Sequence, residues 1–346
     1  MSSPASLPRI GLGMAALGRP GYINLDRYIT FGSDHSQRTV DRMQTQSNLV
    51  LDRLFQLCST LHQSNAANNL SGNNCSSLPW IDCARSYGLS ERFVGEYLRS
   101  RHISPNDVYV SSKWGYAYVA NFAVTLPGTA PHEIKDHSVE QFLKQVKETD
   151  SFLGEYINLY QIHSATFESG VLENVQVHHA LDQCRRERGW KIGLSVSSPQ
   201  QDQIIRAAMK IRVDDRPLFD SVQCTYNLLE QRPGPALQEA HNMGMDIIIK
   251  EGLANGRILR QSAVIRYSEQ LACQPDQLAL AVILAQPFQP RVLSGAVTPE
   301  QLKSNFQVAS VQEKLQANPS LLKEIMEACV VPSEEYWAER AALEWN

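Results

Sequence analysis

The runs INLYQI at residues 157–162 and KIGLSV at residues 191–196 decide the fold. Both are short and mostly apolar, without a regular alternation of apolar and polar positions. That pattern is typical of parallel strands that are buried on both faces. Residues 163–190 between them are long enough to hold a helix. The segment therefore predicts one strand–helix–strand unit of a parallel sheet.

Six more runs of the same kind predict strands at Arg9–Leu12, Trp80–Cys83, Val108–Ser112, Ser221–Cys224, Asp246–Ile249 and Arg291–Leu293. Eight units favour a closed barrel over an open, doubly wound sheet, and 346 residues suit one such domain. After the first run, Gly11-Leu12-Gly13 continues with Met14-Ala15-Ala16, which is not a Rossmann fingerprint. We predict the α/β class, as a single (β/α)8 TIM barrel over residues 1–346.

Helix signals lie between these runs. Ser138–Leu153 has a helical apolar stripe and a capping box, and Ser198-Pro199 and Thr298-Pro299 resemble two further helix starts. A first helix is predicted over roughly Gln37–His62. The polar run SNAANNLSGNNCSS at 64–77 predicts a flexible insertion before the second strand. Residues 311–346 predict a C-terminal extension of two helices, over Val311–Ala328 and Ser333–Asn346.

The composition narrows the classes of function. The net charge of −4 argues against nucleic acid or an anionic membrane as the main partner. No stretch approaches about 20 consecutive apolar residues, and the first residues do not resemble a signal peptide. The seven cysteines form no C-x-x-C pair. We therefore expect a cytoplasmic protein without a metal site or disulfide framework, acting on a small molecule.

Four polar residues follow strands at the expected mouth of the barrel. Asp82 ends the second strand, Lys113 follows the third, and His163 follows the fourth. Tyr87 lies five residues after Asp82, in the loop before a helix that begins near Ser90-Glu91. Each alone fits an ordinary role, as a loop aspartate, a turn aromatic, a solvated lysine or a core histidine. Together they fit the catalytic end of a barrel.

These residue types suit the reduction of a carbonyl group. Hydride transfer to a carbonyl creates an alkoxide that needs a proton, which Tyr87 can supply. Lys113 is expected to lower the pKa of the tyrosine, and Asp82 to hold the lysine in place. His163 can orient the carbonyl oxygen by a hydrogen bond.

The segment DCARSYGLSE at 82–91 resembles the aldo-keto reductase signature D-T-A-x-x-Y-G-x-S-E. INLYQIH at 157–163, SVQCTYNLL at 221–229 and SGAVTPEQL at 294–302 are also similar to segments of that family, in the family's order. The resemblance implies a catalytic tetrad of Asp82, Tyr87, Lys113 and His163. It also implies NADPH or NADH as the cofactor, with NADP slightly favoured.

The resemblance places the cofactor across the barrel mouth. It implies that Ser195 and Gln223 hold the nicotinamide carboxamide, and that Leu253 and Gly256 lie along the pyrophosphate. It implies that the segment from Ser294 to Asn305 covers the adenosine end, where the helix start at Thr298 offers free N–H groups to a phosphate. Aromatic residues are expected to line the substrate pocket: Trp114, Tyr116 and Tyr118, with Trp337 from the C-terminal segment.

This sequence departs from the family at three places. Val196 follows Ser195 where many members have asparagine, so one carboxamide contact is missing unless Ser197 replaces it. Lys250 stands where many members stack an aromatic ring on the nicotinamide; it could instead contact a phosphate or a substrate anion, or pair with Glu251 or another carboxylate. Gly295 and Gln301 stand where several members hold the 2′-phosphate of NADPH with a lysine and an arginine. We therefore predict weaker discrimination between the two cofactors than is usual in the family, unless a nearby cation compensates. The candidates for that role are Lys303, Arg257 and Arg260.

Two alternatives to a reductase or dehydrogenase stay open at the sequence level. The family contains channel-associated members, so the chain could be a redox-sensing regulatory subunit with little turnover. An unrelated barrel lyase or isomerase could use Lys113 as a Schiff-base amine.

Overall fold

The computed structural model describes residues 9–67 and 78–346. Within them, eight parallel strands close a barrel in the order in which they follow one another along the chain. The strands are β1 (Ile10–Gly13), β2 (Trp80–Asp82), β3 (Tyr109–Trp114), β6 (Ile157–Ala165), β7 (Lys191–Val196), β10 (Ser221–Thr225), β11 (Asp246–Lys250) and β12 (Arg291–Ser294). Each predicted strand overlaps an observed one, and the predicted fold class is confirmed.

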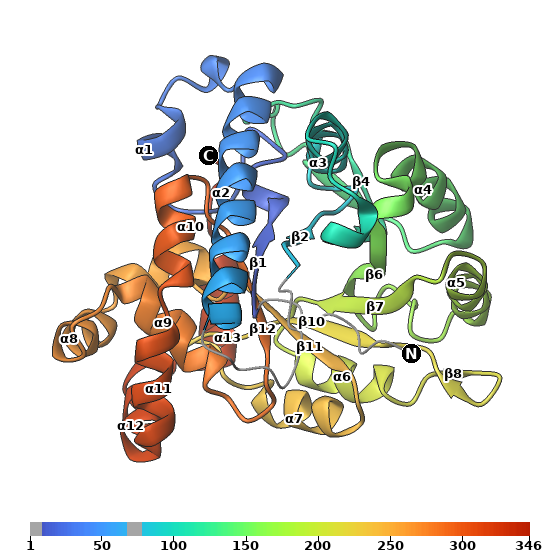
Figure 1. Cartoon of the computed structure of the whole chain (residues 1–346). Coiled ribbons are helices and arrows are strands. Elements are labelled where there is room, and N and C mark those ends of the chain that lie inside the picture. Colours follow the sequence, from blue (N-terminus) through green and yellow to red (C-terminus); the bar gives the residue numbers. More distant parts are fainter. Residues whose placement is uncertain (1–8, 68–77) are drawn as a thin grey trace.

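Helices surround the barrel, as Figure 1 shows. They are α1 (Arg27–Phe31), α2 (Val40–Ala67), α3 (Ser90–Ser100), α4 (Val139–Phe152), α5 (Val175–Arg188), α6 (Gln201–Ala208), α7 (Gly234–Asn242), α8 (Ser262–Gln270), α9 (Pro275–Leu284), α10 (Pro299–Phe306), α11 (Ala309–Ala317), α12 (Pro319–Cys329) and α13 (Ser333–Ala341). Two antiparallel hairpins extend from the loops: β4 (Tyr116–Tyr118) with β5 (Glu133–Lys135), and β8 (Arg212–Val213) with β9 (Arg216–Pro217).

The interior of the barrel is filled by side chains. Trp80, Leu159, Ile248 and Leu293 form a buried cluster separate from the main core. The indole of Trp80 covers Gly11, where an added Cβ would lie 2.3 Å from the ring. Glycine is therefore required on β1 at this level, because any larger residue would displace the tryptophan.

Several helix boundaries follow from the caps. Ser138 and Thr298 cap α4 and α10 by accepting a hydrogen bond from the third helical N–H, as predicted. The helix expected after Ser198 begins later, at Gln201, because Ser198 forms a tight turn with the N–H of Gln200. Helix α2 extends to Ala67, so residues 64–67 are helical and not part of a loop. The rest of the predicted insertion, 68–77, lies outside the described residues.

The C-terminal extension contains three helices where two were predicted. The expected helix over 311–328 divides at Asn318, because Pro319 excludes a helical conformation for the residue before it. The side chain of Asn318 then caps α12 by accepting from the N–H of Leu321. Helix α13 follows Pro332, where the predicted separation is confirmed.

In the described part of the chain, no helix combines the length and apolar character needed to cross a bilayer. The same residues contain no group of three His, Cys, Asp or Glu side chains placed to hold a metal ion. The six cysteines described are free.

Candidate active site

The four residues singled out from the sequence meet at the carboxyl ends of the strands. Asp82 ends β2 and Lys113 lies near the end of β3, so the two strands bring their side chains together. His163 lies near the end of β6, and Tyr87 lies in the loop between β2 and α3. All four are buried or nearly so.

Asp82 and Lys113 form a fully buried ion pair. The ammonium group of Lys113 also donates to the carbonyl of Cys83 at 3.0 Å. The second carboxylate oxygen of Asp82 accepts from the hydroxyl of Ser111 at 2.7 Å. A buried ion pair needs such additional hydrogen bonds to offset the cost of removing both charges from water. This pair therefore holds the lysine in a fixed position.

Tyr87 lies between cationic and aromatic groups. The Lys113 ammonium is 4.7 Å from the centroid of the tyrosine ring, and the His163 ring meets it edge-on at 5.3 Å. Burial raises the pKa of Tyr87 well above its ordinary value, and Asp82 adds to this rise while Arg19 opposes it. Lys113 is not among the groups that dominate this pKa, so the expected lowering by Lys113 stays a prediction. Lys113 directs its charge to Asp82, and burial dominates at the phenol.

His163 is held in a neutral state. Its Nδ1 atom lies 3.2 Å from the hydroxyl of Ser86. Burial lowers the pKa of His163 well below its ordinary value, and the cations Lys113, Lys250 and Arg19 lower it further. A neutral imidazole with one nitrogen engaged by a hydroxyl can present the other nitrogen to a ligand.

Arg19 belongs to the site although the sequence did not single it out. Its guanidinium lies 5.3 Å from the centroid of the Tyr87 ring and 4.6 Å from the Trp345 ring. It donates to Glu133 at 2.9 Å and to the carbonyl of Ser86 at 3.0 Å. These partners are distant from Arg19 in the chain, so no local pattern around it could have indicated the contact.

A cavity of about 860 Å³ extends from Tyr87 and His163 to the start of α10. Eight of the predicted cofactor-binding residues line it: Gln223, Lys250, Leu253, Gly256, Ser294, Gly295, Gln301 and Asn305. Thr298 does not line the cavity and instead caps α10. A cavity of this size lies within the range of small-molecule and cofactor sites.

Two predicted residues lie behind the cavity wall. Ser195 is fully buried and accepts a hydrogen bond from the N–H of Ser164 at 2.8 Å, while Ser164 and Ser197 line the cavity. Trp114 is fully buried against Phe142, at 4.9 Å between ring centroids. This corrects the prediction that Trp114 lines a substrate pocket, because the strand directs its ring into the layer between barrel and helices.

The other predicted pocket aromatics also lie outside the cavity lining. Tyr116 is half-buried and meets the His163 ring at 5.0 Å, so it supports the histidine from the side. Tyr118 is half-buried in the hairpin of β4 and β5. Trp337 is buried beside Tyr336, and the tryptophan on the cavity wall is Trp345.

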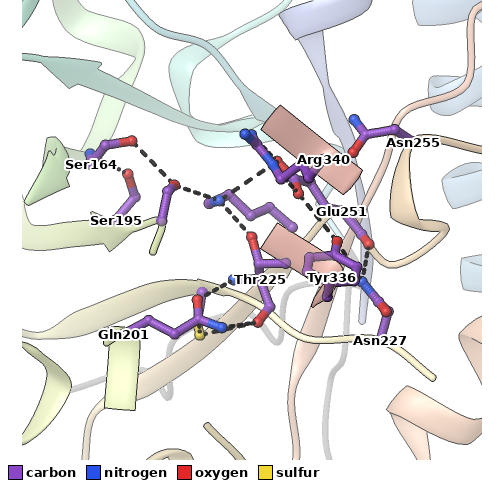
Figure 2. A network of polar contacts seen from close by, with 12 residues as sticks. Ser164, Ser195, Gln201, Thr225, Asn227, Glu251, Asn255, Tyr336 and Arg340 are labelled. Atoms are coloured by element: carbon purple, nitrogen blue, oxygen red, sulfur yellow. Dashed lines mark hydrogen bonds and ion pairs between the residues drawn. The ribbon is translucent and has the colours of Figure 1, made fainter. Parts of the chain in front are cut away.

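Lys250 is the centre of a polar network at the ends of β7, β10 and β11. Its ammonium group donates to Thr225 at 2.7 Å and to Ser197 at 2.8 Å. The adjacent Glu251 is held by Arg340 of α13 at 2.5 and 2.8 Å, an arrangement visible in Figure 2. Burial lowers the pKa of Lys250 to about 8, and Glu251 opposes this change.

Gln223 offers an acceptor to a ligand. Its amide nitrogen lies 3.3 Å from the carboxylate of Asp82, and its amide oxygen is buried without a hydrogen-bond partner. Buried polar atoms are almost always satisfied, so an unpartnered oxygen on a cavity wall indicates that a donor binds there. A primary carboxamide, as in nicotinamide, carries such a donor. On this observation the residues present fit a nicotinamide cofactor.

The far end of the cavity is acidic. Asp276 and Glu300 line it, and Asp276 accepts from the side chain of Asn305 at 2.7 Å. The Gln301 side chain accepts from the N–H of Val297 at 2.9 Å.

The three cations that could compensate for Gly295 and Gln301 are placed differently. Arg260 lines the cavity but pairs with Asp26 at 2.6 Å. Lys303 is exposed and Arg257 pairs with Glu339, and neither lines the cavity.

The described residues thus form a closed parallel barrel with a buried Asp–Lys pair, and a tyrosine and a histidine line one end of its cavity. A family model described as "Aldo/keto reductase family" matches residues 65–325. The chain therefore belongs to the aldo/keto reductase family, and the resemblance seen in the sequence is confirmed.

The chain is also similar to individual proteins, and to the solved structures among them in fold. YqkF of Bacillus subtilis (strain 168), described as an uncharacterized oxidoreductase, is 24% identical over 259 residues, covering 67% of this chain and 78% of the relative. An aldo-keto reductase of Bacillus halodurans, solved in a holo form, superposes with a TM-score of 0.60 at 18% identity, covering 96% of this chain and 97% of that one. An aldo-keto reductase enzyme from a Medee basin deep-sea metagenome library gives 0.58 at 17% identity, with 92% of each chain covered.

Proposed function

We propose that this protein is an NAD(P)H-dependent oxidoreductase that interconverts carbonyl compounds and alcohols. The observation that carries the proposal is that Asp82, Tyr87 and His163 line one end of a cavity that continues to Asn305, with Lys113 buried against Asp82. When bound, the nicotinamide supplies the hydride for reduction, or accepts it for oxidation. Aldehydes, ketones and sugars are the candidate substrates.

Different side chains would donate a proton to the carbonyl oxygen, stabilise the resulting phenolate and orient the carbonyl. With its pKa raised, Tyr87 is protonated at neutral pH and can donate its phenolic proton to that oxygen as the alcohol forms. The phenolate left behind faces the Lys113 ammonium, 4.7 Å from the ring centroid, and the Arg19 guanidinium. If Ser86 donates to Nδ1, His163 carries its proton on Nε2, where it can orient the carbonyl.

The test is NAD(P)H oxidation against a panel of aldehydes, ketones and sugars, under multiple turnover, with Tyr87→Phe as the diagnostic variant. Phenylalanine keeps the ring contacts and removes only the hydroxyl, so the fold should be unaffected. A tyrosine that supplies the proton should cost at least about a hundredfold in kcat when its hydroxyl is removed. Full activity in this variant would show that the proton comes from another group.

The multiple-turnover condition also tests the regulatory alternative. Steady turnover that depends on Tyr87 supports an enzyme, whereas cofactor binding with a single slow oxidation supports a redox-sensing subunit. Failure of borohydride to trap a carbonyl compound on Lys113 would count against the Schiff-base alternative, in which Lys113 would form a covalent bond beside Asp82.

A further inference from the structure

Lys250 is a cation that the proton chemistry at Tyr87 does not use. It is the last residue of β11, and its side chain is 14% exposed on the cavity wall. Thr225 and Ser197 each accept one of its three ammonium protons. The Glu251 carboxylate is 3.8 Å away but lies closer to Arg340, at 2.5 Å. The hydroxyls fix the position of the charge without neutralising it.

At the end of the cavity that Tyr87 and His163 line, the positive side chains outnumber the carboxylates that pair with them. Among the described residues there, Lys113 is matched by Asp82 and Arg19 by Glu133. The single carboxylate of Glu251 is shared by Lys250 and Arg340. Because Glu251 binds Arg340 more closely, Lys250 is the less closely paired of the two cations that share this carboxylate.

This charge lies next to the groups that fit a nicotinamide. Ser197, which Lys250 holds, lines the cavity together with Gln223 and its unpartnered oxygen. The two redox states of the cofactor differ by one positive charge, which the oxidised ring carries and the reduced ring does not. We propose that Lys250 makes the protein select the reduced cofactor, by weakening the binding of NAD(P)+ relative to NAD(P)H. The inference rests on the proposed function, because it requires a nicotinamide in this cavity.

The expected size follows from Coulomb's law. At an effective dielectric constant of about 20, two unit charges about 12 Å apart interact by roughly 1.4 kcal/mol, which is a factor of ten in a dissociation constant. Any shorter separation between the ring and the ammonium group increases the factor. For a nicotinamide ring bound within about 12 Å of the ammonium group, Lys250 should therefore raise the ratio of Kd for NAD(P)+ to Kd for NAD(P)H at least about tenfold.

The discrimination should also depend on pH. The charged and titratable groups around Lys250 are Glu251, Arg340, Cys224, Lys113 and His163. Glu251 has a pKa of about 2, and the pKa of Cys224 is raised well above its ordinary value by burial. The pKa of His163 is well below its ordinary value, and Lys113 is paired with Asp82. Lys250, with a pKa of about 8, is therefore the group expected to change charge between pH 6.5 and 9.5.

The experiment measures equilibrium dissociation constants by calorimetry for NADH, NAD+, NADPH and NADP+, without substrate. The variants are Lys250→Met, which removes the charge at similar length, and Lys250→Arg, which keeps it. Lys144→Met on α4, where the side chain is 67% exposed, is the control for removing a distant charge. Raising the pH of the unmodified protein removes the Lys250 charge without any substitution.

The ratio of oxidised to reduced Kd should fall about tenfold or more in Lys250→Met, and stay within threefold in Lys250→Arg and Lys144→Met. In the unmodified protein it should fall as the pH rises through about 8, and in Lys250→Met it should be flat. An unchanged ratio in Lys250→Met, with both forms still bound, overturns the role of Lys250 and leaves the proposed function standing. Failure of the unmodified protein to bind any of the four cofactors overturns both.

Discussion

The buried pair of Glu251 and Arg340 should stabilise the fold, and Glu251→Gln measures by how much. The Glu251 side chain is only 8% exposed. Glu251 is the residue directly after β11, whereas Arg340 lies on the last helix, α13. The pair therefore fastens the C-terminal extension to the barrel. Burial alone would raise the pKa of Glu251, but Arg340 and Lys250 outweigh it and lower the pKa to about 2, from an ordinary 4.5.

The pKa difference sets the magnitude. It corresponds to about 3 kcal/mol of folding stability at pH 7. Because the folded-state pKa is the lower one, this contribution is complete above about pH 5 and is lost as the pH falls from 4.5 towards 2. At pH 3.5 about 2 kcal/mol of it should remain. Glutamine keeps the size and an acceptor oxygen, so the variant removes mainly the charge.

The assay is urea unfolding of the unmodified protein and Glu251→Gln, at pH 7 and at pH 3.5. We expect the free energies of unfolding to differ by about 3 kcal/mol at pH 7 and by about 2 kcal/mol at pH 3.5. Glu239→Gln is the matched control, because Glu239 pairs with Arg206 on the exposed surface and should not shift the midpoint measurably. A difference below about 1 kcal/mol at pH 7, or one that grows on acidification, would refute the reasoning.

Two further predictions concern the cavity. The preference for NADPH over NADH in kcat/KM should stay below about a thousandfold, or roughly 4 kcal/mol. The reason is that Asp276 and Glu300 line the far end of the cavity and that Arg260 is paired with Asp26 there. A larger preference would contradict the prediction of weak discrimination. Trp114→Phe should leave the KM for substrate within about twofold, because the ring does not line the cavity. A KM several times higher in this variant would place the ring at the substrate. Trp114→Phe should change the free energy of unfolding by less than about 1 kcal/mol, because the loss of buried apolar area is offset by removal of an indole N–H that has no hydrogen-bond partner.

The barrel could be predicted from the sequence because its signals are local. Apolar runs bounded by polar segments indicate buried parallel strands, and the carboxyl end of each strand indicates where side chains converge. Asp82, Lys113 and His163 are all located by this rule, and Tyr87 by its distance from Asp82. Their gathering at one end of the cavity follows from strand register, which pairs Asp82 with Ser111 and Lys113 with Gln161.

What could not be predicted depends on contacts between distant segments. Arg19 reaches Tyr87 because Glu133 and Trp345, more than a hundred residues away in the chain, hold its guanidinium. Trp114 is different, because a local rule would have placed it: it follows Lys113 directly, so the alternation of side chains along a strand directs it to the opposite face of β3. The division at Asn318 likewise had a local signal, since the proline after it excludes a continuous helix.

Asp82 contacts both Lys113, beside the tyrosine, and Gln223, whose side chain fits a nicotinamide. One of its carboxylate oxygens binds Lys113, and the other accepts from Ser111 and from the amide nitrogen of Gln223. An amide whose nitrogen is committed to a carboxylate must present its oxygen elsewhere, so Asp82 determines that Gln223 offers an acceptor to the cavity. Where this chain has Val196, many members of the family have an asparagine that also holds the carboxamide. The acceptor fixed by Asp82 does not depend on residue 196, so the valine there leaves the unpartnered oxygen of Gln223 in place.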